Sequence, residues 1–292
     1  MKSKLQQSLE AGKFTITSEM APPKGTDFSH ILSIAEDIKD RVVAANVTDF
    51  QSAAVKASSL SMCIELERIG LESVLQMTGR DRNRIAIQGE LLSAAHFGVK
   101  NLLALTGDHP VVGDNPQAKP VFEFDSVSIL QAAVILNGGK DLAGNPLEGT
   151  PNFFLGASVT PVFDPIEVQI MKMRSKIAAG AKFFQTQGVY DVETMRELKK
   201  QTEGMDCYIL AGIIPLKSPG MARYMNNNVP GIRVPEEAIE RLSKAENKEE
   251  EGIRISGEYI AQLKDEGLCD GVHIMAIGAE ENVPKILDVA GL

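Results

Sequence analysis

Short apolar runs alternate with longer amphipathic stretches along the whole chain, and this alternation constrains the fold more than any other feature. Eight runs have the composition of buried strands: 14–19, 42–48, 73–78, 101–106, 152–158, 182–187, 207–215 and 271–275. Each is followed by at least one helical pattern, at 30–40, 59–69, 82–97, 126–136, 165–179, 192–201, 218–226, 235–244, 249–264 and 281–289. Eight β-then-α units predict an α/β fold of the (β/α)8, or TIM, barrel type.

The strand runs are continuously apolar, which is typical of a parallel sheet covered on both faces. A doubly wound open sheet is the competing architecture, but no G-x-G-x-x-G follows the first run, which disfavours it. The chain has 292 residues and neither an internal repeat nor a long linker. We therefore expect one domain, a single barrel over residues 1–292.

Composition excludes several classes of partner. The chain carries 30 Lys and Arg against 39 Asp and Glu, a net charge of −9, so it has no general attraction for nucleic acids or anionic membranes. No apolar run approaches the roughly 18 residues of a membrane span. Residues 1–13 lack the apolar segment of a signal peptide, and the three cysteines form no CxxC pair. These features predict a cytoplasmic protein without a metal site.

Polar residues follow the strand runs, where the strands of a barrel open into one shared mouth. Glu19 ends the first run, and Pro22 and Pro23 prevent the strand from continuing because proline has no N–H to donate. Asp108 follows the fourth run. Two carboxylates in one desolvated cavity repel each other, which favours one protonated acid and one anion.

The other residues at the strand ends suit a heterocyclic ligand. Gly107 permits close approach to the backbone, and amides and alcohols match the donors and acceptors of a ring edge. They include Gln76, Thr78, Thr106 and Gln187. There is no P-loop, so a nucleoside triphosphate is not expected.

Each of these residues also has a purely structural interpretation. Asp108 after Thr-Gly is typical of a turn, and Glu19 before the prolines is compatible with a solvent-exposed loop. Gln187 can be a buried amide bonded to backbone, and His273 on an apolar strand is typical of a hydrogen-bonded core histidine. Arg80 and Arg82 fit a phosphate site and the start of a helix equally well. Their joint position at strand ends favours the functional interpretation.

Taken in order, the motifs resemble the methylenetetrahydrofolate reductase family along nearly the whole chain. The matching segments are Ser18-Glu19-Met20-Ala21-Pro22-Pro23, Val47-Thr48, Leu105-Thr106-Gly107-Asp108, Lys176-Ile177-Ala178-Ala179-Gly180-Ala181, Thr186-Gln187, Gly212-Ile213-Ile214-Pro215 and Gly271-Val272-His273.

The resemblance implies an oxidoreductase of one-carbon metabolism that reduces 5,10-methylenetetrahydrofolate to 5-methyltetrahydrofolate. It implies that Glu19 is the general acid and that Asp108 holds the pterin and stabilises a cation. Gln187 would contact the folate, and Lys217 or Arg223 its tail. The implied cofactor is a flavin, FAD in the first place or FMN. Its contacts would be Thr48, Gln76, Thr106, Gly107, Asp108, Ala157 and Lys176.

Three segments depart from the family pattern. Gln76 stands where many members carry histidine, and the segments 217–221 and 275–279 lack the expected aromatic residues. Such departures resemble the reductases of anaerobic, acetogenic one-carbon metabolism (the Wood–Ljungdahl pathway). The electron donor is then either NAD(P)H or a reduced partner, such as a second subunit that carries zinc or iron–sulfur centres. The resemblance is also compatible with a role in methionine biosynthesis and with a homo-oligomer.

Two other functions fit the same residues. One is a pterin-binding barrel of the methyltransferase type, which shares the carboxylates but needs no flavin. The other is a non-catalytic subunit of a one-carbon complex. A bound chromophore separates the first from a flavoprotein reductase, and turnover with an artificial electron donor separates the second.

Overall fold

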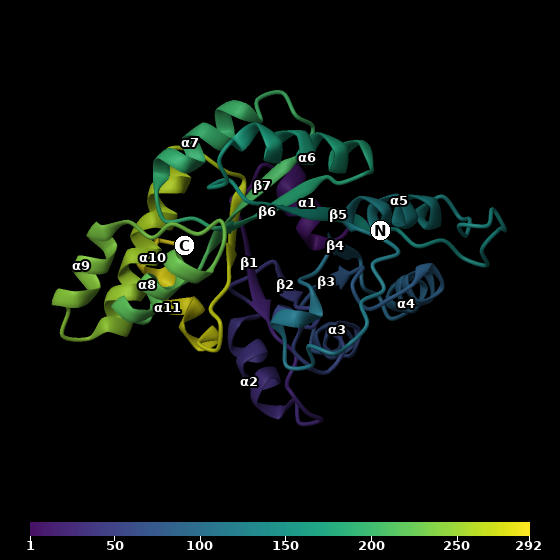
Figure 1. The fold of residues 1–292 in the computed structure, drawn as a ribbon, viewed down its shortest axis with the longest axis horizontal. Helices are drawn as coiled ribbons and strands as arrows, with labels where there is room; N and C mark the ends of the chain where they lie inside the picture. Colours follow the sequence, from purple (N-terminus) through teal and green to yellow (C-terminus); the bar gives the residue numbers. More distant parts are fainter.

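The computed structural model describes residues 1–292 and contains one closed barrel of parallel strands (Figure 1). Each strand pairs with the next, and β8 pairs with β1, so the doubly wound alternative is excluded. The strands are β1 (Thr15–Met20), β2 (Ala44–Val47), β3 (Ser73–Thr78), β4 (Asn101–Leu105), β5 (Phe154–Val159), β6 (Phe183–Gly188), β7 (Tyr208–Ile213) and β8 (Gly271–Ile274). The predicted (β/α)8 barrel is confirmed.

Helices surround the strands, and extra ones lie between β7 and β8. The helices are α1 (Lys4–Glu10), α2 (Ser29–Ile38), α3 (Ser59–Arg68), α4 (Arg84–His96), α5 (Ser126–Asn137), α6 (Ile166–Ala178), α7 (Val192–Gln201), α8 (Pro219–Asn228), α9 (Glu236–Lys244), α10 (Lys248–Asp265) and α11 (Val283–Val289). Three short 3₁₀ turns complete the fold: η1 (Gln51–Ala53), η2 (Pro110–Val112) and η3 (Glu280–Asn282). Helices α8 and α9 extend to one side of the barrel and have a small apolar core of their own (Figure 1).

Side-chain oxygens define where several helices begin. Asn83, Asp125, Asp191 and Asn247 each accept a backbone N–H from the first turn of α4, α5, α7 and α10. Helix α2 has no side-chain cap of this kind. Ser29 is its first residue rather than its cap, and the carboxylate of Asp27 accepts the Ser29 N–H at 2.9 Å.

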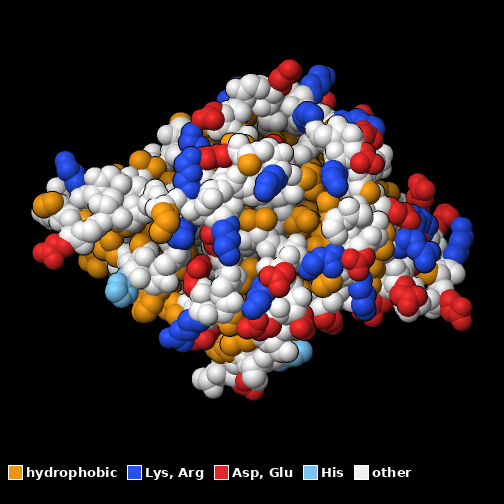
Figure 2. All heavy atoms as spheres, turned by 180° about the vertical axis from the view of Figure 1, so that it is seen from behind, with side chains coloured by type: hydrophobic (Ala, Val, Ile, Leu, Met, Phe, Trp, Pro, Cys, Tyr) orange, Lys and Arg blue, Asp and Glu red, His pale blue; other side chains and the backbone are white.

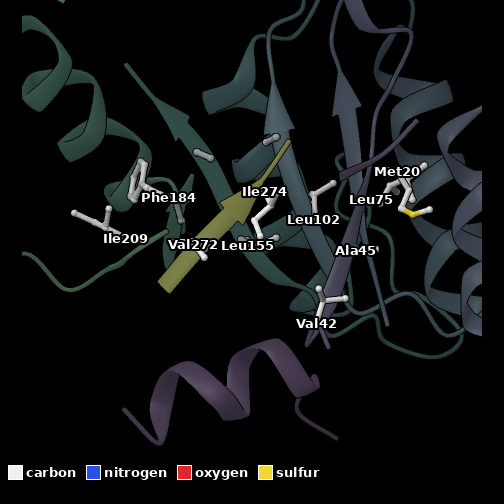
Figure 3. Packing of buried hydrophobic residues seen from close by; sticks show 14 of the residues in the cluster. Met20, Val42, Ala45, Leu75, Leu102, Leu155, Phe184, Ile209, Val272 and Ile274 are labelled. Carbon is white, nitrogen blue, oxygen red and sulfur yellow. The ribbon is translucent and has the colours of Figure 1, made fainter. Parts of the chain in front are cut away.

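The main hydrophobic core lies between the strands and the helices. Outward-facing residues from all eight strands pack against the helices, and Figure 3 labels members such as Met20, Leu102 and Val272. Burial of this outer shell uses one face of each strand, because successive side chains alternate. The other face is left for the inside of the barrel.

Helix α1 closes the bottom of the barrel. Leu5 and Leu9 are buried against the first inward-facing layer, which consists of Ala44, Val74, Leu103, Phe154, Phe183 and Leu210. Above it, Asn46 and Gln185 exchange two hydrogen bonds across the barrel, of 2.7 and 3.0 Å. The inside is therefore filled from below and open only at the carboxyl ends of the strands.

The outer surface carries mixed charge. Figure 2 shows acidic and basic side chains interspersed with apolar ones over one face, with no single basic area. No helix has the length and apolarity needed to cross a membrane.

Candidate active site

A cavity of about 430 Å³ opens at the carboxyl ends of the strands. Most of the predicted site residues line it: Glu19, Gln76, Thr106, Gly107, Asp108, Lys176 and Gln187. They come from β1, β3, β6, α6 and the loop after β4. The barrel thus brings together residues that are far apart in the sequence, as its shared mouth requires.

Glu19 is buried in the wall of this cavity. It occupies an inward-facing position of β1 beside Asn46 of β2, and its side chain is only 10% exposed. Gln51 and Gln76 approach the carboxylate from two sides, each with an Nε2 to oxygen distance of 3.4 Å. These hydrogen bonds are long, so they orient the carboxylate, and no short hydrogen bond to another side chain occupies its oxygens.

His273 lies directly behind Glu19. Its Nε2 is 3.7 Å from the Glu19 carboxylate, and its Nδ1 is 3.0 Å from the hydroxyl of Thr17, its neighbour in the β1–β8 register. The ring is buried, as expected of a core histidine, and it also lines the cavity. The purely structural interpretation of His273 is therefore incomplete.

Gly107 and Asp108 form the cavity wall after β4. Gly107 has a φ of +91°, and a Cβ there would lie 3.0 Å from the Cβ of Thr78, so only glycine fits. Asp108 is exposed at the mouth and lines the same cavity as Glu19. Its carbonyl accepts a hydrogen bond of 3.3 Å from Arg80. The loop is thus fixed through its backbone, and no hydrogen bond within the chain involves the Asp108 side chain.

A buried ion network supports the loops around the cavity. Asp49 accepts bonds from both Nη atoms of Arg82, at 2.7 and 3.0 Å, and from the backbone and hydroxyl of Thr78. Burial opposes the charge of Arg82, but its bonds to Asp49 and Glu90 outweigh this effect and raise its pKa. Arg80 also has partners within the chain, because it donates hydrogen bonds to Asp81 and to the backbone carbonyls of Asp108 and Phe50. Both arginines thus have structural partners, so neither is free to serve as a phosphate anchor.

The loop after β2 carries unusual backbone strain. Phe50, Ser52 and Ala53 all have φ between +47° and +55°, a region that non-glycine residues rarely adopt. Gly113 lets the segment after β4 pack closely against this loop, because a Cβ there would lie 2.0 Å from the carbonyl oxygen of Ala53. This strained loop presents Gln51 to Glu19. Sequence reasoning missed Gln51, since left-handed non-glycine residues have no sequence signature.

Gln187 is positioned by an irregularity in β6. The register between β6 and β7 shifts between Gln185 and Gly188, which is the signature of a bulge. The Gln187 side chain folds back so that its Oε1 accepts the N–H of Gly188 at 3.0 Å. The residue lines the cavity, and its amide nitrogen donates to no other group of the chain.

Lys176 joins this cavity to a second, lateral one between α5 and α6. The lateral cavity, of about 880 Å³, is also lined by Lys172 and Arg174. It shares five lining residues with the first cavity: Thr106, Ser126, Ser158, Thr160 and Lys176. Lys176 donates to the carbonyl of Ser158 at 2.6 Å. Burial, together with the nearby charge of Lys172, lowers the pKa of Lys176 to about 8.

Three predicted residues lie outside the cavity lining. Ala157 faces outward into the core between strands and helices, and Thr48 is buried just beyond the end of β2. Lys217 donates to the carbonyl of Ile277 at 2.6 Å on the rim. Their side chains do not reach the cavity in this structure.

The cysteines are separate from this site. Burial raises the pKa of Cys207 to about 11 and that of Cys269 to about 12, and both lie at the amino ends of β7 and β8. No group of three or more His, Cys, Asp or Glu side chains is arranged to hold a metal ion.

Comparison with known proteins gives a consistent result. The sequence matches the family described as methylenetetrahydrofolate reductase over residues 4–291. "Methylenetetrahydrofolate reductase 2" of Saccharomyces cerevisiae is 26% identical, over 98% of this chain and 48% of that protein. "5,10-methylenetetrahydrofolate reductase" of Pectobacterium carotovorum is 24% identical, over 91% of this chain and 87% of that protein.

Coverage of the relatives differs. The chain spans 34% of the length of a Caenorhabditis elegans relative and about half of the yeast one. Among solved structures, an uncharacterized Clostridium thermocellum protein that binds two copies of 5-methyl-5,6,7,8-tetrahydrofolic acid has the same fold. It aligns with a TM-score of 0.63 and 16% identity, over 98% of this chain and 99% of that one. The match over residues 4–291 shows that this chain belongs to the methylenetetrahydrofolate reductase family.

Proposed function

We propose that this protein catalyses the flavin-dependent reduction of 5,10-methylenetetrahydrofolate to 5-methyltetrahydrofolate. One observation carries the proposal. In a member of this family, an acid on β1, a carboxylate after β4 and an amide on β6 line one cavity at the barrel mouth. An acid, an anion and a ring-binding amide are the groups that protonation of an amine followed by reduction of a cation needs.

The lining fits a flavin. Leu103 and Leu105 provide an apolar floor, Gln76 and Thr106 provide hydrogen-bonding groups, and Lys176 provides a cation at the entrance to the lateral cavity. When bound and reduced, the flavin supplies the hydride of the reaction. We propose FAD, with FMN as the smaller alternative, and a nucleotide tail that points toward the lateral cavity between α5 and α6.

Glu19 would give its proton to N10 of the folate. The bond between N10 and the bridging carbon then breaks, and the electron pair of N5 forms a double bond to that carbon, which leaves a cation. Asp108 lines the same cavity and would lower the energy of this cation. The carbon becomes a methyl group when it accepts the hydride, and Glu19 is left as a carboxylate. Gln187 would hold the pterin ring during these steps.

For the electron donor, we propose only its chemical class. The segment 217–221 offers no aromatic residue for a nicotinamide ring. We therefore retain two donors, NAD(P)H and a reduced partner protein, and a screen of NADH, NADPH and reduced ferredoxin would separate them.

Two measurements test the proposed function. The purified protein should absorb at about 380 and 450 nm, as flavoproteins do. Glu19→Gln should retain this spectrum and its reduction by the donor, yet lose folate turnover by about 10²–10⁴-fold, the usual effect of a general acid. Glu148→Gln, in the exposed loop after α5, is the matched control. A colourless protein that added flavin does not restore would refute the assignment, and full folate turnover by Glu19→Gln would refute the acid.

A further inference from the structure

His273 is the one buried histidine of the chain, and the proposed reaction gives it no role. The other three histidines are exposed, whereas the His273 side chain is only 3% exposed and lies between Thr17 and Glu19. Electrostatic interactions are strong in such a buried environment. The ring must therefore influence how readily the neighbouring acid keeps its proton.

No lysine or arginine forms an ion pair with the Glu19 carboxylate. The two cations that line the same cavity have other partners, because Arg80 binds Asp81 and Lys176 donates to a backbone carbonyl. His273 is thus the only basic side chain that reaches Glu19, with its Nε2 at 3.7 Å from the carboxylate. This distance is too long for a normal hydrogen bond, but it is short enough for the dipole of the ring to act on the acid.

The other contact of the ring determines where its hydrogen lies. The Thr17 hydroxyl oxygen is 3.0 Å from Nδ1 of His273 and 3.4 Å from the carbonyl oxygen of Val272. A carbonyl oxygen can only accept, and a hydroxyl has a single hydrogen. Both contacts are therefore hydrogen bonds only if Thr17 donates to Val272 and accepts from Nδ1. The neutral ring then carries its hydrogen on Nδ1, and the lone pair of Nε2 faces Glu19.

The group that Nε2 presents decides which form of Glu19 the ring favours. An N–H directed at the carboxylate would stabilise the anion, whereas a lone pair opposes the anion and favours the protonated acid. The amides of Gln51 and Gln76 donate over 3.4 Å, so they support the anion only weakly. A general acid must be protonated before the substrate reacts, and the lone pair of His273 favours that form.

We infer that Thr17 and His273 are positioning residues for the acid: Thr17 holds the imidazole as the Nδ1–H tautomer, and the free Nε2 keeps the proton on Glu19. This inference rests on the proposed function, in which Glu19 gives that proton to N10 of the folate. In that step the O–H bond of Glu19 breaks and an N10–H bond forms, while the ring keeps its own hydrogen. Thr17 does not line the active-site cavity, so it acts on the reaction only through the ring.

Nitrogen NMR reads the tautomer directly, without substrate. In protein labelled with nitrogen-15 histidine, the shifts of Nδ1 and Nε2 show which atom carries the hydrogen, and the signal that His273→Gln removes is that of His273. The wild type should carry the hydrogen on Nδ1 at neutral pH. Thr17→Val removes the hydroxyl, and the ring should then change to Nε2–H, which the Glu19 carboxylate can accept. Thr17→Ser should keep the wild-type tautomer.

The reaction of reduced flavin with folate supplies the second measurement. Flavin-loaded enzyme is reduced with dithionite and mixed with 5,10-methylenetetrahydrofolate, and absorbance follows the reoxidation of the flavin. Thr17→Val should slow reoxidation at saturating folate by about 10- to 100-fold, because a hydrogen bond to a charged group has an effect of this order. The folate concentration for half-saturation should change by no more than about twofold, since the lost effect is on the proton and not on binding. Thr17→Ser should restore most of the rate.

Thr15→Val is the matched control. Thr15 is also fully buried on the inner face of β1, but its hydroxyl contacts Ser8 and the carbonyl of Lys13 and not His273. This change should therefore alter neither the tautomer nor the rate of reoxidation.

Three results would overturn the inference. They are a wild-type ring that carries its hydrogen on Nε2 or on both nitrogens, a Thr17→Val enzyme that reoxidises as fast as the wild type, and equal slowing by Thr15→Val. A wild-type enzyme whose reduced flavin never reacts with the folate would instead refute the proposed function. The tautomer is still measured in that same protein, so the two failures are distinguishable.

Discussion

Lys176 shows how burial tunes a single residue of the site. Lys176 lines both the first cavity and the lateral cavity, which together would hold the flavin and its nucleotide tail. Its only hydrogen bond is to the carbonyl of Ser158. Desolvation brings its pKa to about 8, so the side chain changes charge just above neutral pH. An anion bound there stabilises the protonated form, and the protonated form in turn binds the anion.

Flavin affinity should therefore depend on pH. Below pH 8 the Lys176 ammonium attracts the flavin phosphate, and as the pH rises through about 8 the proton is lost and affinity should fall. Lys176→Met should weaken binding at neutral pH and remove this dependence. Lys172→Met should shift the midpoint to higher pH, because Lys172 is one cause of the lowered pKa. Fluorescence titration of the apoprotein between pH 6.5 and 9.5 checks both, and a pH-independent affinity in the wild type would contradict the prediction.

At the scale of elements, the stability of α1 depends on a carboxylate from another part of the chain. Glu72, just before β3, accepts the N–H groups of Lys4 at 2.7 Å and Leu5 at 2.9 Å, and also the amide of Asn101 at 3.0 Å. A carboxylate at a helix N-terminus satisfies free donors and interacts well with the helix dipole. Leu5 and Leu9 are thereby held against the bottom of the barrel.

Glu72→Gln should loosen this helix. The amide nitrogen cannot accept, so at least one of the three donors bonded to Glu72 loses its partner, at a cost of about 1–3 kcal/mol in the free energy of unfolding. Urea denaturation measures the loss, and hydrogen exchange should rise first at residues 4–10. Glu10→Gln on the exposed end of the same helix is the control, with an effect within about 0.5 kcal/mol. Equal effects of the two changes would show that Glu72 has no special role.

The sequence predicts strands better than it predicts the details between them. All eight strands lie where continuous apolar runs predict them, because both faces of a barrel strand are buried. The role of α1 as a plug was not predictable, since two leucines four residues apart do not reveal what they cover. The β6 bulge and the left-handed loop that carries Gln51 were also not predictable, because both arise from packing between distant segments.

The placement of the site residues follows the same logic. Glu19, Asp108 and Gln187 were predictable because parallel strands end at one mouth. Ala157 and Thr48 were assigned by resemblance, and the alternation along a strand turns Ala157 away from the cavity. Lys217 lies at the carboxyl-end face of the barrel, as predicted, but its ammonium donates to the carbonyl of Ile277 on the rim.

At the scale of the whole molecule, closure of the barrel links the two ends of the chain. β8 pairs with β1, and Arg41 binds both Asp288 and the carbonyl of Leu292, so the first and last parts of the chain stabilise each other. Neither the N-terminal nor the C-terminal half of the chain can form the closed sheet by itself, because the barrel needs strands from both. We therefore expect residues 1–292 to unfold as one cooperative unit, as a single domain does.

Flavin should raise the temperature of that single transition. A ligand at 100 times its dissociation constant stabilises the folded state by about 2.7 kcal/mol, because it binds only the folded protein. For a chain of 292 residues, this corresponds to an increase of roughly 4–5 °C in Tm. Calorimetry of apoprotein and flavin-loaded protein measures the shift, and Lys176→Met, at the same flavin concentration, should show a smaller one. Two separate transitions would contradict the single domain, whereas one transition that does not move with flavin would contradict the cavity as the flavin site.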